Sequence, residues 1–560
     1  MLDDQTPSVA ATSLAQADAI ATQLHQRKDA WVNVSIPDRI TYLRRCLDGV
    51  RAVAPEWATA ACHAKGIDPA STLAGEEWFV GPTATIAGLR SLILTLETKG
   101  QPKPVRLRRD GQTIAQVFPA NVMERLLWRG FIGEVWLQPE KPPTQGMVYR
   151  QKPAAGTLAL VLGAGNVSSI APLDALQKLF AEAAVVLLKM NPVNAYMGAL
   201  LETAFQPLRE DGFLEIVYGG AELGRHLCQH PLVDTIHITG SHHTHDAIVW
   251  GSTPDEQAQR KAASQPLTTK PITSELGCVT PVIVIPGHWS EADIAFQARH
   301  VAGMVVHNAS FNCAAAKVII TAKGWAQRDV FLAQLQQELA KTPARKAYYP
   351  GAQERYQAFL ERYPQAIALG QSEPPTTVPW TLIPEVPAQA GEYALTQEAF
   401  CGVLADVSLN ATEASDFLSQ AIAFANEQVW GNLSCTVLVD TRTQKQLGKE
   451  FEAAIAQLKY GAIGINVWSA VLFSLPVFSW GAFPGNSLQD ITSGRGVVHN
   501  AFLFEHPQKS VLRAPFRIFP LPIWFARHPN LLQLAQRFTD FQAKPSWRQL
   551  LKVALASLRG

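Results

Sequence analysis

The sequence predicts an α/β protein built on parallel sheets that helices cover on both faces. Between residues 157 and 239, short apolar runs alternate strictly with amphipathic segments, which is typical of βαβ units. A second region, from about 276 to 495, opens on another apolar run at 281–285. Nucleotides bind such sheets at the carboxyl ends of the strands, so we expect the functional residues there.

Each element follows from its local pattern. Apolar runs between turn-forming residues predict strands at 157–162, 184–189, 213–218 and 233–239, and amphipathic segments predict helices at 172–182, 195–208, 221–229, 291–304 and 326–341. Residues 8–100 are Ala-rich and predicted helical, with breaks near Pro37 and Pro55. We expect a hairpin over 106–119, turning at Asp110-Gly111, and a further strand over 147–150.

Composition excludes several classes of protein. The chain has 560 residues, enough for about two to four domains, and its 48 basic and 47 acidic residues give no sign of a nucleic-acid partner. Its seven cysteines are scattered without a CxxC pair, so we expect neither a disulfide framework nor a zinc site. The acidic start Met1-Leu2-Asp3-Asp4 lacks the features of a signal peptide. A reducing, cytoplasmic setting is therefore expected.

Cys313 is the candidate nucleophile. It lies between Asn312 and a run of alanines, just before the strand-like residues 318–321. A loop at the edge of a rigid element can present a thiolate to a substrate without letting it drift, and we expect a loop-to-helix junction here, whose N–H groups would lower the pKa of the thiol. A free cysteine is more often simply buried, so the stretch alone favours a structural role. Other motifs reverse that judgement.

Four of these motifs follow predicted strand ends in a regular order. Asn166 follows Gly163-Ala164-Gly165, and Lys189 comes 189 − 166 = 23 residues later, the length of one strand–helix–strand unit. Cys313 follows Glu275 by 313 − 275 = 38 residues. Glycines at strand-to-helix turns suit a pyrophosphate, because the free N–H groups of a helix start point at it. The turns in question contain Gly219, Gly224, Gly240 and Ser241.

Together the motifs resemble the aldehyde dehydrogenase superfamily over residues of about 130 to 500. The resemblance implies that Cys313 attacks an aldehyde, that Asn166 and the Cys313 N–H hold the oxyanion, and that Glu275 activates water to hydrolyse the thioester. It also implies an NAD or NADP site. The implied cofactor-binding residues are Gly165, Lys189, Asn191, Gly219, Gly224, Gly240, Ser241, Leu276, Glu398 and Phe400.

Three departures from the family pattern affect what is expected. Pro192 stands three residues after Lys189, where NAD-preferring members often carry Glu, so NADP is not excluded. Ser310-Phe311 replaces the usual Gly-Gln before the nucleophile. Cys278 stands where a second glycine is usual.

The resemblance further implies a division into domains and a homo-oligomer, either dimer or tetramer. We expect N-terminal helices of the nucleotide-binding domain at 1–129, oligomerisation strands at 130–152 and 497–514, a Rossmann-type nucleotide domain at 153–275, a catalytic domain at 276–496 and a C-terminal extension at 515–560.

The expected reaction is NAD(P)-dependent oxidation of an apolar aldehyde to an acid. The aromatic side chains of Phe473, Phe478, Trp480 and Phe483 are expected to wall the substrate tunnel, which suggests medium or long chains or an aromatic aldehyde. One alternative is a reductase that makes an aldehyde from an acyl-CoA thioester with NADPH. Another is a non-catalytic relative that binds a membrane or a partner through its tail.

Two segments have open interpretations. From Lys509 onward there are nine Lys or Arg residues and one acid, Asp540. This tail either packs on the body of the protein, which we favour, or contacts an anionic membrane surface. His242, His243, His245 and Asp246 resemble metal ligands but match no zinc spacing, so we interpret them as a solvated helix start and expect no metal.

Overall fold

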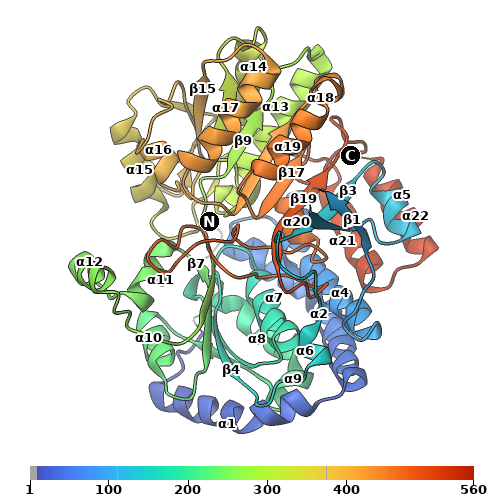
Figure 1. Cartoon of the computed structure of the whole chain (residues 1–560), viewed down its shortest axis with the longest axis vertical. Coiled ribbons are helices and arrows are strands. Elements are labelled where there is room, and N and C mark those ends of the chain that lie inside the picture. The colour runs from blue at the N-terminus through green and yellow to red at the C-terminus, as the bar shows by residue number, and fades with distance from the viewer. Residues whose placement is uncertain (1–8, 110, 374, 560) are drawn as a thin grey trace.

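Two β-sheets organise the computed structural model, which describes residues 9–109, 111–373 and 375–559 (Figure 1). A six-stranded sheet lies in the lower half of Figure 1, with α1 (Leu14–Asn33) running along its outer side. An eleven-stranded sheet fills the upper half and continues toward the C-terminal helices. The α/β fold class predicted from the sequence is confirmed.

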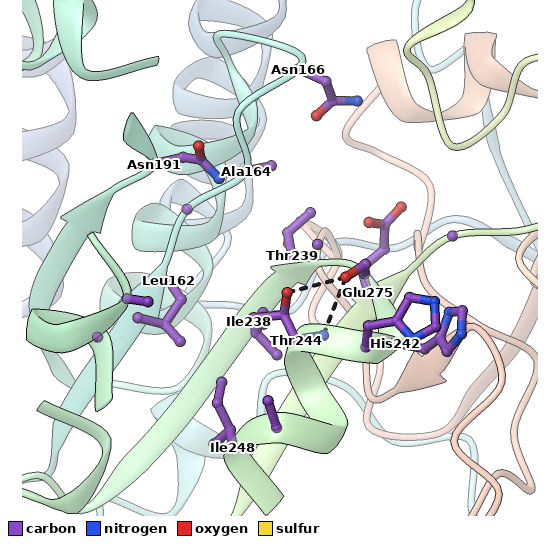
Figure 2. A pocket seen from close by; sticks show the side chains of 18 of the residues that line it. Leu162, Ala164, Asn166, Asn191, Ile238, Thr239, His242, Thr244, Ile248 and Glu275 are labelled. Carbon is purple, nitrogen blue, oxygen red and sulfur yellow. Dashed lines mark hydrogen bonds between the residues drawn. The ribbon is translucent and has the colours of Figure 1, made fainter. Parts of the chain in front are cut away.

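The six-stranded sheet contains the alternating region and has the strand order β18-β8-β7-β4-β5-β6. The chain runs outward from β4 to β6 and then returns to the other side of β4 for β7 and β8. The loops after β4 and β7 therefore meet at a topological switch point, where α/β sheets bind ligands (Figure 2). The strands are β4 (Leu158–Leu162), β5 (Val185–Met190), β6 (Leu214–Tyr218), β7 (Thr235–Gly240), β8 (Ile272–Leu276) and β18 (Gly494–Arg495).

Helices cover both faces of this sheet, and one of them corrects a prediction. The sequence predicted a helix break near Pro55, but Pro55 lies inside the continuous helix α2 (Ile36–Ala64). Packing of the neighbouring Val53 and Trp57 in the core outweighs the cost of about 3 kcal/mol for an interior proline. The other helices are α3 (Ala74–Trp78), η1 (Phe79–Thr83), α4 (Ala84–Glu97), α7 (Ile170–Leu176), η2 (Gln177–Ala181), η3 (Pro192–Met197), α8 (Gly198–Ala204), α9 (Gln206–Glu210), α10 (Ala221–Gln229), α11 (His242–Val249) and α12 (Pro254–Ala263).

The continuous helical stretch Ala74–Glu97 is long and apolar enough to cross a membrane by length and composition alone. However, 78% of its most apolar window is buried inside the molecule, so packing within the fold accounts for its apolar character.

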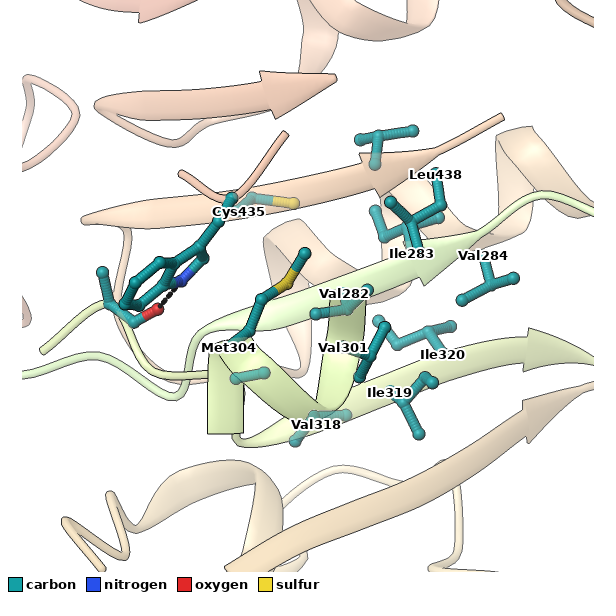
Figure 3. Packing of buried hydrophobic residues seen from close by; sticks show 14 of the residues in the cluster. Val282, Ile283, Val284, Val301, Met304, Val318, Ile319, Ile320, Cys435 and Leu438 are labelled. Atoms are coloured by element: carbon teal, nitrogen blue, oxygen red, sulfur yellow. Dashed lines mark hydrogen bonds between the residues drawn. The ribbon is translucent and has the colours of Figure 1, made fainter. Parts of the chain in front are cut away.

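The eleven-stranded sheet holds the second core. In Figure 3, Val282 of β9 and Ile319 of β10 lie in parallel register, and Val301 and Met304 of α13 pack against these strands. These β-branched runs are buried on both faces, as expected of central parallel strands. In spatial order the strands are β1 (Val105–Arg109), β2 (Gln112–Phe118), β3 (Ile132–Leu137), β19 (Pro507–Arg513), β17 (Ala462–Ile465), β16 (Ser434–Leu438), β9 (Pro281–Val284), β10 (Val318–Ala322), β15 (Val403–Leu409), β14 (Trp380–Ile383) and β12 (Ile367–Leu369).

Further helices surround this sheet, and a separate strand pair joins β11 (Arg345–Lys346) to β13 (Thr377–Val378). The helices are α13 (Glu291–Val306), η4 (His307–Ser310), α14 (Arg328–Ala340), α15 (Ala352–Arg362), α16 (Tyr393–Thr396), α17 (Ala414–Glu427), α18 (Thr441–Leu447), α19 (Lys449–Gln457) and α20 (Ala470–Ser474).

The strands expected to mediate oligomerisation extend the second sheet. β3 pairs antiparallel with β19 and with β2, and β2 forms the predicted hairpin with β1. Asp110, at the predicted turn, lies outside the described residues. The strand predicted at 147–150 is wrong, because Met147–Arg150 forms the helix α6. Gly146, at φ +63°, turns the chain into that helix, and a glycine adopts this conformation without strain.

The C-terminal extension packs on the body of the protein. Its helices α21 (Leu531–Ala543) and α22 (Trp547–Ser557) bury Leu534, Leu550 and Val553 in a cluster with Phe79 of η1. α22 also lies beside α5 (Val122–Leu127) (Figure 1).

Candidate active site

A cavity of about 940 Å³ opens at the switch point of the six-stranded sheet. Figure 2 shows Asn166, from the loop after β4, and Glu275, from β8, on the border of one space with Thr239 and His242. Cys313 lines the same cavity from the second sheet. The cavity therefore spans both sheets and joins the predicted nucleotide-binding residues to the predicted nucleophile.

Strand-to-helix turns supply the features that a pyrophosphate needs. α10 begins after Gly220, and α11 begins after Ser241, whose Oγ accepts a hydrogen bond from Thr244 N at 3.2 Å. A Cβ on Gly165 would lie 2.7 Å from Asn191 Oδ1, so only glycine lets these two loops approach so closely. The N–H groups of the first two residues of each helix have no acceptor among the described residues and can bind an anion.

The far end of the cavity carries cations. Lys189, near the end of β5, is buried. Its side chain lies against Gly224, where an added Cβ would be 3.5 Å from Lys189 Cε. Arg225 and Pro192 line the same cavity. This arrangement suits ribose hydroxyls or a phosphate attached to them.

Glu398 and Phe400 line the end of the cavity nearer the second sheet. Burial raises the pKa of Glu398 to about 7, although the positive charge of Lys317 lowers it. Among the described residues, Glu398 Oε1 is buried with no hydrogen-bond partner, an acceptor that a ribose hydroxyl would satisfy. Phe400 packs 5.0 Å from Tyr349, ring to ring. Cavity size, helix starts and this orphaned acceptor all fit a dinucleotide.

Cys313 lies on a turn before β10 and is half-buried; its Sγ donates to Asn312 Oδ1 at 3.9 Å, and the carboxyl group of Glu275 is near enough to perturb the thiol. The sequence argument expected it at a loop-to-helix junction whose N–H groups lower its pKa. That expectation is wrong, because the turn leads into a strand, and burial together with the charge of Glu275 raises the pKa of the thiol. The nucleophile therefore needs a base to remove its proton.

Glu275 is placed to be that base. It is buried, and its carboxylate accepts a hydrogen bond from Trp480 Nε1 at 3.2 Å. Burial raises its pKa to about 7, although the neighbouring Cys313 thiol and the hydrogen bond from Trp480 oppose this. A carboxyl group with a pKa near neutrality can both accept and release a proton at physiological pH.

Asn166 is tied to the loop that carries the nucleophile. Its Nδ2 donates to Phe311 O at 3.1 Å, which uses one of its two N–H groups. Asn308 Nδ2 donates to Phe311 O at 2.8 Å and to Asn166 O at 3.1 Å. Asn308, Ala309 and Ser310 all have positive φ, between +53° and +67°, a conformation that L-residues rarely adopt.

A second cavity, of about 60 Å³, meets the first at Asn166 and Cys313. Its walls are mostly apolar, and the C-terminal extension contributes Ile523 and Trp524 to them. Of the four aromatic residues predicted to wall a tunnel, Phe473 and Trp480 line this cavity and Phe478 and Phe483 do not.

The predicted site residues fall into two groups. The large cavity is lined by Cys313, Glu275, Asn166, Lys189, Asn191, Gly224, Gly240, Ser241, Glu398 and Phe400. Gly165, Gly219 and Leu276 lie behind its wall. Gly165 serves the close approach to Asn191, and Leu276 is fully buried in β8, where its N–H donates to Ser493 O.

Sequence reasoning missed residues that come from distant parts of the chain. Tyr349 and Arg355 line the large cavity, and Asn308 holds the catalytic loop. No local pattern marks them, because their roles depend on contacts between separate elements. Within the described ranges, no group of three or more His, Cys, Asp or Glu residues is placed to hold a metal ion. His242 instead packs on His243 and Trp430.

Comparison with known proteins gives a consistent result. A model of the aldehyde dehydrogenase family matches residues 132–354, whereas the comparison with curated protein sequences finds no match. Among solved structures, an aldehyde dehydrogenase from Mycobacterium tuberculosis complexed with NAD+ is 17% identical with a TM-score of 0.62, covering 92% of each chain.

Two further structures are similar to the same degree. NADP-dependent glyceraldehyde-3-phosphate dehydrogenase from Bacillus halodurans, complexed with NADP, is 16% identical with a TM-score of 0.61, covering 90% of this chain and 92% of that one. Salicylaldehyde dehydrogenase from Pseudomonas putida, complexed with salicylaldehyde, is 16% identical with a TM-score of 0.61, covering 91% and 93%. At such identities these neighbours show the fold.

Proposed function

We propose that this chain, which belongs to the aldehyde dehydrogenase superfamily, oxidises an apolar aldehyde to a carboxylic acid through a thioester on Cys313. The observation that carries the proposal is that Cys313 and Asn166 stand where the two cavities meet, while Glu275 lines the larger of them. A nucleotide-sized space lies on one side of this junction, and a small apolar space lies on the other.

The first step uses the closeness of the Cys313 thiol to the carboxyl group of Glu275. Burial holds the thiol in its neutral form, so Glu275 takes the proton as the sulfur attacks the carbonyl carbon. The remaining N–H of Asn166 donates to the developing oxyanion, together with the Cys313 N–H. Such donors typically lower a barrier by a few kcal/mol, about 3 to 4 for one of them.

A bound NAD or NADP would supply the acceptor for the hydride of the adduct carbon. Lys189 and the starts of α10 and α11 would hold its phosphates and adenine ribose, while Glu398 and Phe400 would hold its other end. The adduct on Cys313 thereby becomes a thioester.

Hydrolysis of the thioester returns the site to its starting state. Glu275 first releases the thiol proton to solvent; as a carboxylate it then takes a proton from water while the water oxygen attacks the acyl carbon, and it passes that proton to the leaving sulfur. The sulfur leaves, the acid departs, and the thiol of Cys313 is restored. In total, aldehyde, water and NAD(P)+ give acid, NAD(P)H and one proton.

The second cavity suggests the size of the aldehyde. A space of about 60 Å³ holds only a few heavy atoms, since one water needs roughly 10–15 Å³ by a comparable measure. We therefore infer a short apolar aldehyde as the preferred substrate, rather than the medium or long chain that the aromatic residues suggested. Trp524 and Phe473 set this limit.

We also infer a preference for NADP over NAD. Lys189 and Arg225 line the cavity together, and Pro192 stands where a carboxylate would repel a 2′-phosphate. Glu256, which lines the same cavity, already forms an ion pair with Arg260 at 3.0 Å.

A homo-oligomer is proposed through the second sheet. β1 lies at the end of the sheet and carries the exposed side chains of Val105 and Leu107. An edge strand of this kind invites pairing with another chain. Light scattering on the purified protein would give the number of copies.

The test of the function is formation of NAD(P)H by the purified protein with aldehydes of increasing chain length. Cys313→Ala and Glu275→Gln are expected to abolish turnover. Cys46→Ala, which removes a thiol from the core behind the nucleotide-binding sheet, is the matched control and should keep it. Turnover that survives Cys313→Ala would contradict the proposal. Activity only with an acyl-CoA and NADPH would assign the reductase alternative, which the comparisons do not favour.

A further inference from the structure

The last helix of the chain has two apolar faces. One face of α22 packs on the protein through Leu550, Val553 and Ala556. The opposite face carries Trp547, Leu551 and Leu555, and Leu558 follows directly after the helix. These side chains are 53–60% exposed, which is unusual for such large apolar groups.

The exposed residues form one stripe. They recur at intervals of four, four and three residues, so successive side chains lie above one another on a helix. α5 lies beside α22 and adds Val122 and Leu126, which are four residues apart and 58% and 60% exposed. The stripe therefore widens into an apolar patch across two helices, and we refer to these six residues as the α5/α22 face.

Cations surround the α5/α22 face. α22 has the sequence WRQLLKVALAS, which contains Arg548 and Lys552 and no acid. Arg559 follows it, and α5 and the next turn add Arg125 and Arg129. The one acid of α5, Glu124, accepts a hydrogen bond from Ala120 N at 2.8 Å and so serves the helix start.

We propose that the α5/α22 face binds an anionic lipid surface and anchors the enzyme peripherally on a membrane. A helix with Trp and Leu on one side and Lys and Arg flanking them lies in the plane of the headgroups, with its apolar side buried. Trp547 suits the boundary between headgroups and acyl chains. The cations gain from the negative surface potential of such a leaflet.

A second copy of the chain fits this surface less well. A two-fold contact would place the same five cations of each copy against one another, with no acid on α22 to offset them. A contact with a different surface of the next copy would have to close into a ring or propagate into an open filament. An anionic bilayer satisfies the apolar stripe and the charge together.

The test is co-sedimentation of the full chain with phosphatidylcholine vesicles, with and without phosphatidylserine. We expect binding only to the anionic vesicles, weakening as salt rises. Leu551→Glu combined with Leu555→Glu should reduce binding roughly tenfold or more, because it places charge in the buried stripe. Ile367→Glu and Val330→Glu change exposed apolar residues elsewhere and are the matched controls.

Aldehyde oxidation by each variant checks that it is folded, since the α5/α22 face contains no residue of the active site. Equal binding to neutral vesicles, or binding retained by the double variant, would overturn the proposal. A change of oligomeric mass in the double variant, without lipid binding by the wild type, would assign the face to a second copy and overturn it as well.

Discussion

Replacing Lys65 by Met is expected to lower both the stability and the turnover of the enzyme. Lys65 is buried at the end of α2, far from the nucleophile in sequence. Its ammonium group donates to Glu77 Oε1 at 3.0 Å, to Glu77 Oε2 at 2.8 Å and to Asn308 Oδ1 at 2.9 Å. The side chain therefore joins the N-terminal helices to the loop that leads to Cys313.

The cost in stability follows from burial. Glu77 is fully buried, so removing its partner leaves a carboxylate without a counter-ion in the core. Breaking a buried pair in this way costs about 3–5 kcal/mol. The control is Lys28→Met, which breaks a 3.0 Å ion pair with the partly exposed Asp234 and should cost about 1 kcal/mol or less.

The effect on turnover has a separate cause. Asn308 begins three consecutive residues with positive φ, and each such residue costs of order 1–3 kcal/mol unless its surroundings hold it. Lys65 donates a hydrogen bond to the side chain of Asn308, and the backbone N–H of Asn308 donates to Glu76 Oε1 at 2.8 Å. Without Lys65 the loop can relax and move Cys313 away from Asn166, so kcat should fall more than KM changes.

A double variant separates the two effects. Lys65→Met with Glu77→Leu removes both charges and should recover most of the lost stability, because an apolar pair replaces an ion pair at little cost. It does not restore the bond to Asn308, so kcat should stay low. The assays are the urea midpoint of unfolding and steady-state kinetics. Full kcat in the double variant would refute the positioning role, and an unchanged midpoint in Lys65→Met would refute the burial argument.

Three further outcomes are expected. Turnover limited by deacylation should rise with pH through about 7 and then level off, since the ionised form of Glu275 is the base and burial raises its pKa to about 7; a flat profile would contradict this. Trp524→Ala should raise kcat/KM for longer aldehydes, measured over a chain-length series, and an unchanged series would place the acyl chain elsewhere. Lys189→Met should weaken NADP binding more than NAD binding by calorimetry; equal weakening would exclude contact with the 2′-phosphate.

Local sequence patterns were sufficient to predict the structure where neighbouring residues decide it. Alternating apolar runs predicted the order of β4 to β7 because the periodicities of strands and helices depend on consecutive residues. The motifs at the strand ends were predicted for the same reason, since parallel strands bring their carboxyl ends to one edge. Cys313, Glu275 and Asn166 could thus be chosen from order and spacing through the family resemblance.

Local pattern failed where packing opposed a local preference. Pro55 usually ends a helix, but α2 is held by the core around Trp57. Residues 147–150 have strand-like side chains, yet they follow Gly146 in a left-handed turn and form a helix.

The sequence by itself determined the fold class, the nucleotide-binding sheet and the chemical types at the site, because these depend on periodicity and chain order. Only the tertiary structure decided the environment of those groups. Burial, not helix N–H groups, governs the thiol of Cys313, and Trp480 and Lys65 reach the site from distant elements. The physical reason is that pKa, cavity size and loop geometry depend on what is packed around a residue, and chain order does not carry that information.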